Sequence, residues 1–93
     1  MEPNVNRFID YLDKVRHLSN NTLQSYRRDI EQYITYIKNN KIESYEKISP
    51  AIITGYMLHL QNKGRAAATV ARSLASIRAF YKYLCKQQIS SID

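Results

Sequence analysis

Residues 67–86 read AATVARSLASIRAFYKYLCK and contain neither glycine nor proline. Apolar side chains recur in this stretch at steps of three and four residues, the period that places them on one face of an α-helix. The predicted inward positions are Val70, Leu74, Ile77, Tyr81 and Leu84. Small, hydroxyl and cationic residues fill the positions between them. The stretch is therefore predicted to form one long amphipathic helix with a solvent-facing polar side.

Three further helices are predicted before it. The first covers residues 4–17, and the second begins at residues 19–21, where serine and asparagine oxygens suit a helix entry, and ends at residues 39–40. Ser49 is the predicted N-cap of the third helix, which has proline at its first position and ends before Gly64. The predicted inward residues of the three helices are Val5, Phe8, Ile9, Leu12 and Val15, then Leu23, Tyr26, Ile30, Tyr33, Ile34 and Ile37, then Ile53, Tyr56, Met57 and Leu60.

These patterns predict a single all-α domain over residues 1–86. The chain has 93 residues, 44% of them hydrophobic, with only two glycines and two prolines, which disfavours a turn-rich β-sandwich. Residues 39–48 form a polar connection that has room for a short turn, and residues 87–93 are predicted to be the start of a linker. We expect no membrane segment and a cytoplasmic location, because neither a long apolar run nor a signal peptide is seen.

The charge of the chain is uneven. Its net charge is +6 and its pI is about 9.6. Residues 1–48 carry eight bases and seven acids, whereas residues 49–93 carry six bases and one acid, at the C-terminus. Because helical surfaces usually mix the two signs, this excess favours a polyanionic partner such as nucleic acid over a membrane surface or a bland basic surface.

Polar faces on two of the helices sharpen this expectation. In the last helix the positions opposite the predicted core carry hydrogen-bonding groups, with further cations at its flanks. Those positions are Arg65, Thr69, Arg72, Ser76 and Tyr83, flanked by Arg78, Lys82 and Lys86. In the second helix the equivalent positions are Asn21, Gln24, Ser25, Arg28, Gln32 and Thr35. Small residues between long cationic ones allow a helix to approach a DNA groove closely.

Catalysis finds no support in the residues. The sequence contains no glycine-rich phosphate loop and no metal-ligand cluster, so we expect neither a cofactor nor a metal site. His17 is interpreted as a structural residue at a helix end, and His59 as a surface residue. Cys85, the single cysteine, is expected to be a small buried side chain rather than a nucleophile.

Two segments resemble a known family. Residues 18–30, LSNNTLQSYRRDI, resemble the LSxNTxxxYRRDL segment of tyrosine recombinases, the Xer-type and phage-integrase proteins. Gly64 followed by residues 69–84, TVARSLASIRAFYKYL, resembles the second signature of that family, in the same order and at a fitting separation. The resemblance covers nearly the whole chain. It implies the N-terminal core-binding domain, a four-helix SAM-like bundle.

The resemblance also implies a function. In the family this domain and a separate C-terminal catalytic domain clamp double-stranded DNA, and the catalytic residues all belong to the second domain. We therefore expect a non-catalytic chain that ends where the linker to the catalytic domain begins. Its expected partners are double-stranded DNA and other recombinase protomers, which form a tetrameric synapse in the full-length protein, with no small-molecule substrate.

Matching positions with the family assigns candidate DNA contacts on the second and fourth helices. The resemblance places Thr22, Gln24, Ser25 and Arg28 on the second helix, and Thr69, Arg72 and Ser76 on the fourth. Arg72 is the candidate for base readout, because an arginine pairs bidentately with guanine. Arg28, Arg65, Arg78 and Lys82 are the candidates for phosphates, and the hydroxyl residues suit either. Ala68 departs from a position that is often polar or basic in relatives, so a contact is expected to be missing there.

Two alternatives stay open at this point. A helix-turn-helix regulator has the same chemistry, but the fourth helix is long for a three-helix reader. A helical protein-interaction module is the alternative from another class.

Overall fold

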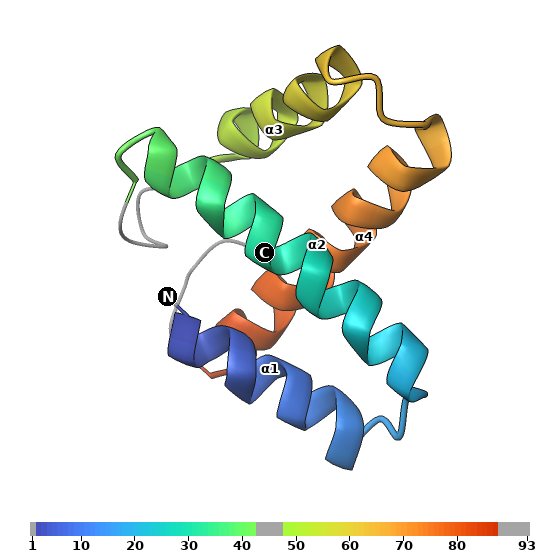
Figure 1. Ribbon diagram of the computed structural model, residues 1–93. Helices are drawn as coiled ribbons and strands as arrows, with labels where there is room; N and C mark the ends of the chain where they lie inside the picture. The colour runs from blue at the N-terminus through green and yellow to red at the C-terminus, as the bar shows by residue number, and fades with distance from the viewer. Residues whose placement is uncertain (1, 43–47, 88–93) are drawn as a thin grey trace.

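The structure is a computed structural model that describes residues 2–42 and 48–87. These residues form four α-helices and no strand: α1 (Glu2–Lys14), α2 (Asn20–Asn39), α3 (Pro50–Asn62) and α4 (Ala67–Lys86). Figure 1 shows the two long helices, α2 and α4, crossing each other, with α1 and α3 at opposite ends of the cross. The all-α prediction is confirmed. The predicted turn within residues 39–48 and the predicted linker fall largely on residues 43–47 and 88–93, outside the described residues.

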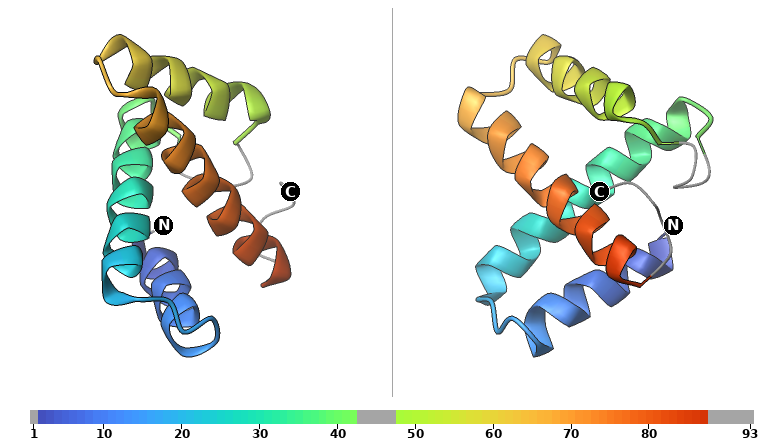
Figure 2. Two further views of the ribbon diagram at one scale, coloured as in Figure 1. Left: turned by 90° about the vertical axis from the view of Figure 1, so that its right-hand side faces the viewer. Right: turned by 180° about the vertical axis from the view of Figure 1, so that it is seen from behind.

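The helices pack in a defined order around the crossing. Helix α1 packs against both α2 and α4, and α3 packs mainly against α4. The view from behind and the side view in Figure 2 show the same arrangement. Side chains of α2 and α3 line a hollow between these two helices.

The helix boundaries follow the expected capping signals. Ser19 caps α2 by accepting a hydrogen bond from the Thr22 N–H at 3.3 Å. Helix α3 starts with Ser49 at the N-cap and proline next to it, as predicted, although the serine side chain makes no capping bond. At its other end Gly64 adopts φ +80°, and the Arg65 N–H donates to the Leu60 carbonyl at 3.1 Å, a Schellman-type end.

The predicted end of the first helix is wrong. Helix α1 ends at Lys14 rather than at His17. His17 has φ +53°, a left-handed backbone conformation that cannot continue a right-handed helix. The N–H of Leu18 then donates to the Leu12 carbonyl at 3.3 Å, which reverses the chain toward α2.

Most of the predicted inward residues form one buried core, whereas Tyr26, Ile53, Met57 and Leu74 are only half-buried. Val15 is 61% exposed, because it follows the last residue of α1 and no longer shares the inward face. Phe80 was not predicted as a core residue, yet it is fully buried, and its ring centroid lies 5.4 Å from that of Phe8. The core of buried residues extends over Val5, Phe8, Ile9, Leu12, Leu23, Ile30, Tyr33, Ile34, Ile37, Ile48, Tyr56, Leu60, Val70, Ile77, Phe80, Tyr81 and Leu84.

Three tyrosines lie deep in this core, where the sequence predicted them. Tyr33, Tyr56 and Tyr81 are each at most 2% exposed, and Tyr26 packs at the edge of the core. The hydroxyls of Tyr33 and Tyr81 share a hydrogen bond of 2.9 Å. Burial raises the pKa of Tyr33 to about 12, so its phenol is neutral at physiological pH.

Candidate nucleic-acid interface

A buried carboxylate joins α2 to α4 at their crossing. Asp29 is 1% exposed and accepts three hydrogen bonds from α4. Arg72 donates from Nε to Oδ2 at 3.1 Å and from Nη2 to Oδ1 at 2.9 Å, and the Ser76 hydroxyl donates to Oδ2 at 2.8 Å. Because a buried charge is stable only when paired and hydrogen-bonded, this cluster fixes how the two helices cross.

The ion pair orients the Arg72 guanidinium. The hydrogen bonds to Asp29 raise the pKa of Arg72 above its ordinary value. Arginine has five N–H donors in one plane, and two of them bind Asp29, which leaves three. The side chain is 46% exposed, so the outer edge of the guanidinium remains accessible to solvent. Arg72 is therefore a surface cation whose orientation is fixed by the buried Asp29 carboxylate.

Asp29 was missed by the sequence prediction, although the sequence contains a signal for it. Asp29 precedes Tyr33 by four residues and Ile37 by eight, so it occupies the inward stripe of α2. A carboxylate at core spacing needs a cationic partner, and α4 supplies only cations and no acid.

The predicted phase of α4 is wrong by part of a turn. Ser76 was expected on the solvent side, but it is 3% exposed and its hydroxyl is bound to Asp29. Leu74 was expected on the inward face and is only half-buried, whereas Ser73 and Phe80 are buried. The reason is the large Phe80 ring, which turns its own side of the helix toward the core. Arg78 is exposed, as predicted.

Four of the predicted DNA contacts meet in one shallow hollow. The hollow has a volume of about 230 Å³ and lies between the N-terminal half of α2 and the middle of α4. It is lined by Thr22, Ser25 and Tyr26 of α2 and by Arg72, Ala75 and Ser76 of α4. The Thr22 hydroxyl lies 2.9 Å from the Ser19 hydroxyl, so it also takes part in capping α2.

Other predicted contacts lie elsewhere on the surface. Gln24 lines a different hollow that it shares with Asp10 and Asp13 of α1 and with Arg27 of α2. Lys82 lies beside Arg16 and Lys86 in a hollow between α1 and α4.

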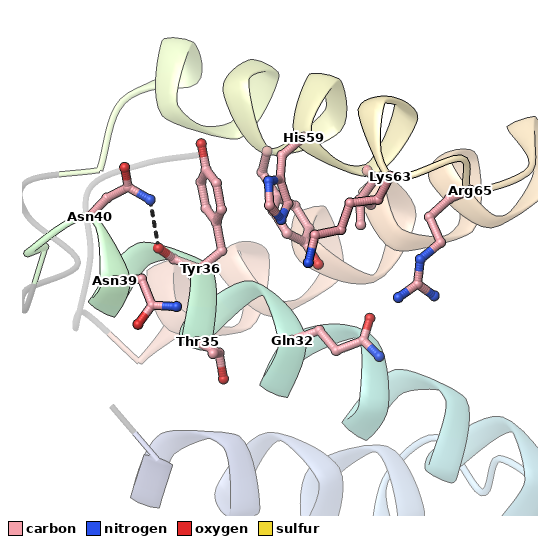
Figure 3. A pocket seen from close by; sticks show the side chains of 10 residues that line it. Gln32, Thr35, Tyr36, Asn39, Asn40, His59, Lys63 and Arg65 are labelled. Carbon is pink, nitrogen blue, oxygen red and sulfur yellow. Dashed lines mark hydrogen bonds between the residues drawn. The ribbon is translucent and has the colours of Figure 1, made fainter.

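Four predicted contacts remain. Arg65 follows α3 and lines a hollow between α2 and α3 (Figure 3). Arg28 and Arg78 are exposed on their helices and Thr69 is half-buried. The structure thus brings together only part of the predicted set.

Two further reactive side chains lie partly buried on α3 and α4. His59 is half-buried, and its ring centroid lies 4.9 Å from that of Tyr36. Cys85 is also half-buried, on α4. Within residues 2–42 and 48–87, no three histidine, cysteine or acidic side chains gather as a metal site would require. None of the described helices has the length and apolarity needed to cross a bilayer.

Comparison with known proteins identifies the class to which this fold and surface belong. Residues 5–88 match the family described as phage integrase, N-terminal SAM-like domain. The chain belongs to this family, and its SAM-like four-helix fold, expected from the two sequence segments, is confirmed.

Individual relatives agree with this assignment. The chain is 38% identical to tyrosine recombinase XerD of Oceanobacillus iheyensis. The alignment covers the whole of this chain and 32% of the relative. It is 40% identical to XerD of Halalkalibacterium halodurans, with 97% of the chain and 30% of the relative aligned. A putative tyrosine recombinase of Caldanaerobacter subterraneus is 41% identical over 86% of the chain and 27% of its own length. The chain therefore spans about a third of the length of these relatives. No solved structure matches it.

Proposed function

We propose that this chain is the DNA-holding domain of a site-specific tyrosine recombinase and that it binds duplex DNA through α2 and α4. The observation that supports the proposal best is the hollow at the crossing of these helices. The two segments that resemble the recombinases meet there, and the Asp29–Arg72 ion pair links one to the other. Packing the helices and presenting a cation at the surface are thus achieved by the same residues.

Arg72 is proposed to contact a base. Its Nη1 group and the second proton of Nη2 point away from the bonds to Asp29, because the guanidinium is planar. Two parallel donors of this kind match the O6 and N7 acceptors of guanine in the major groove. Ser76 supports this contact through Asp29 rather than by touching DNA itself.

The other proposed contacts surround this point. Thr22 and Ser25 line the same hollow and supply short hydroxyl side chains for backbone or base contacts. The cations Arg28, Arg65, Arg78 and Lys82 are proposed to bind phosphates. Gln24 and Thr69 are proposed contacts at the edges of this surface.

The domain is proposed to hold and position DNA rather than to break it. In this proposal residues 1–86 form the DNA-binding unit, and residues 87–93 start the connection to a separate catalytic domain that performs strand exchange. Other recombinase protomers are the proposed protein partners, and the cytoplasm is the proposed location. Purified residues 1–93 should accordingly form no covalent adduct with DNA.

Salt dependence tests the proposal. Fluorescence anisotropy of a labelled duplex, titrated with the chain between low and physiological salt, gives the slope of log K against log[salt]. With about four to six phosphates neutralised, the slope is expected to be roughly −0.9 per contact. Salt-independent binding would contradict an electrostatic DNA surface, and salt-insensitive self-association without DNA binding would instead indicate a protein-interaction module.

A further inference from the structure

A second and larger hollow, of about 520 Å³, lies between the C-terminal half of α2 and α3. Its volume falls in the range of ligand-binding clefts. Cations and amides from both sides line it, among them Gln32, Asn39, Lys63 and Arg65, and its described lining contains no aspartate or glutamate. Figure 3 shows Lys63 and Arg65 extending from the end of α3 toward α2, on the side of Gln32. The hollow is therefore suited to an anion.

A buried hydroxyl at this hollow lacks a partner. Tyr56 lines the hollow and is 2% exposed, and its hydroxyl makes no hydrogen bond within residues 2–42 and 48–87. The hydroxyls of Tyr33 and Tyr81, buried nearby, bind each other. Buried polar groups without partners are exceptional, so this hydroxyl calls for a partner beyond the residues that the structure describes. Burial raises the pKa of Tyr56 to about 12, so the hydroxyl keeps its proton and is able to donate it.

The charges near the Tyr56 hydroxyl are Asp29 and Arg65. The Asp29 carboxylate already accepts three hydrogen bonds, and its charge is paired with Arg72. Arg65 is exposed and lines the hollow. An incoming anion therefore meets a net positive wall formed by Arg65 and Lys63.

We propose that this hollow binds a phosphate group, with Tyr56 as a hydrogen-bond donor and with Lys63 and Arg65 as its counter-charges. The backbone of the duplex held by α2 and α4 is the proposed source of the phosphate, so this part of the inference rests on the proposed function. Helix α2 forms a wall of both hollows. Ser25 and Gln32 lie seven residues apart on it, which is two turns on one face and about 10 Å along the axis. A duplex lying along this face reaches both.

Two variants and a matched control test the inference by duplex binding. Lys63→Gln removes a charge from the hollow, and Arg7→Gln removes one from the exposed surface of α1. Tyr56→Phe removes only the hydroxyl. We expect Lys63→Gln to reduce the salt slope by about 0.9, Tyr56→Phe to weaken binding several-fold at an unchanged slope, and Arg7→Gln to alter neither. Tyr56→Phe is not expected to lower the melting temperature, because the lost hydroxyl makes no hydrogen bond to a described residue.

Chemical-shift titration separates the possible sources of the phosphate. Labelled chain is titrated with the duplex and, separately, with inorganic phosphate, while signals of Thr35, Tyr56 and Lys63 are followed. Shifts with the duplex support the proposal. Shifts with inorganic phosphate alone overturn its assignment to the DNA backbone, and no shift with either probe indicates that the hydroxyl binds only water and overturns the site.

The two proposals fail differently. Wild-type affinity of both Lys63→Gln and Tyr56→Phe for the duplex overturns the α2/α3 site and leaves the α2/α4 surface standing. Absence of duplex binding by the wild-type chain overturns the proposed function, and with it the backbone as the source of the phosphate.

Discussion

The two hollows beside α2 differ in whether their buried polar groups have hydrogen-bond partners among the described residues. At the α2/α4 crossing the Asp29 carboxylate is bound by Arg72 and Ser76, and the exposed edge of the guanidinium is held in place. At the α2/α3 hollow the Tyr56 hydroxyl has no partner among the described residues. In the first region the polar groups are already hydrogen-bonded within the chain before any ligand binds, so its residues serve both folding and the proposed contact. The second is incomplete, so its hydroxyl should be removable without harm to the fold.

The largest effect is expected at the crossing. Arg72→Ala leaves the buried Asp29 charge with only a serine donor, so the free energy of unfolding should fall by about 3 kcal/mol. Urea denaturation followed by circular dichroism measures the loss.

A double variant controls for lost packing. Asp29→Ala combined with Arg72→Ala should cost much less than the sum of the two single changes, because no unpaired buried charge remains. Strict additivity would show that the ion pair contributes nothing to the crossing.

Alkaline pH is expected to act on the tyrosine core. Unfolded tyrosines lose their protons near pH 10, whereas Tyr33 and Tyr56 hold theirs up to about pH 12. Because the folded state favours the neutral phenols, the stability that they confer is complete below pH 10 and is lost as the pH rises to 12. Thermal melts across this range measure the decline, which should be shallower in a Tyr33→Phe/Tyr56→Phe variant. An identical decline in that variant would assign the effect to other groups.

Removal of a paired hydroxyl has a smaller expected effect. Tyr33→Phe breaks the 2.9 Å hydrogen bond to Tyr81 in the core, at an expected cost of about 1 kcal/mol. The cost is measured from the urea concentrations at the unfolding midpoints of the two proteins, provided that the free energy of unfolding falls with urea at the same slope in both. A change near zero would show that this bond is no better than the bonds to water that it replaces.

The smallest effect is expected for the unpaired hydroxyl. Tyr56→Phe should change the free energy of unfolding by less than about 0.5 kcal/mol, or stabilise the chain, because no hydrogen bond within residues 2–42 and 48–87 is lost. The same denaturation series provides the comparison with Tyr33→Phe. A loss as large as that of Tyr33→Phe would mean that the two hydroxyls are equally well bonded in the folded chain.

Local chemistry made most of the fold predictable. Helix spacing, the Ser19 cap and Gly64 after α3 all act within one turn of the chain, so the sequence alone indicates them. The errors concern the rotation of α4 about its own axis. The prediction placed Leu74 rather than Phe80 on the inward face, and this rotation put Ser76 on the solvent side.

The candidate site was less predictable, for a physical reason. The pairing of Asp29 with Arg72 depends on how two helices cross, and these residues are far apart in the sequence. The grouping of Thr22 with Arg72, and the separation of Gln24 from both, are likewise set by helix packing. Residue types indicated a basic, hydrogen-bonding surface, but only the packed helices show which members adjoin.

Amide chemical-shift mapping tests most directly whether duplex DNA binds the surface at the α2/α4 crossing. Labelled chain is titrated with a duplex selected by the chain from a random pool. We expect the largest shifts at Thr22, Ser25 and Arg72, with little change at Arg7 and Asp13 on the exposed side of α1. Shifts centred on α1, with the crossing unchanged, would contradict it.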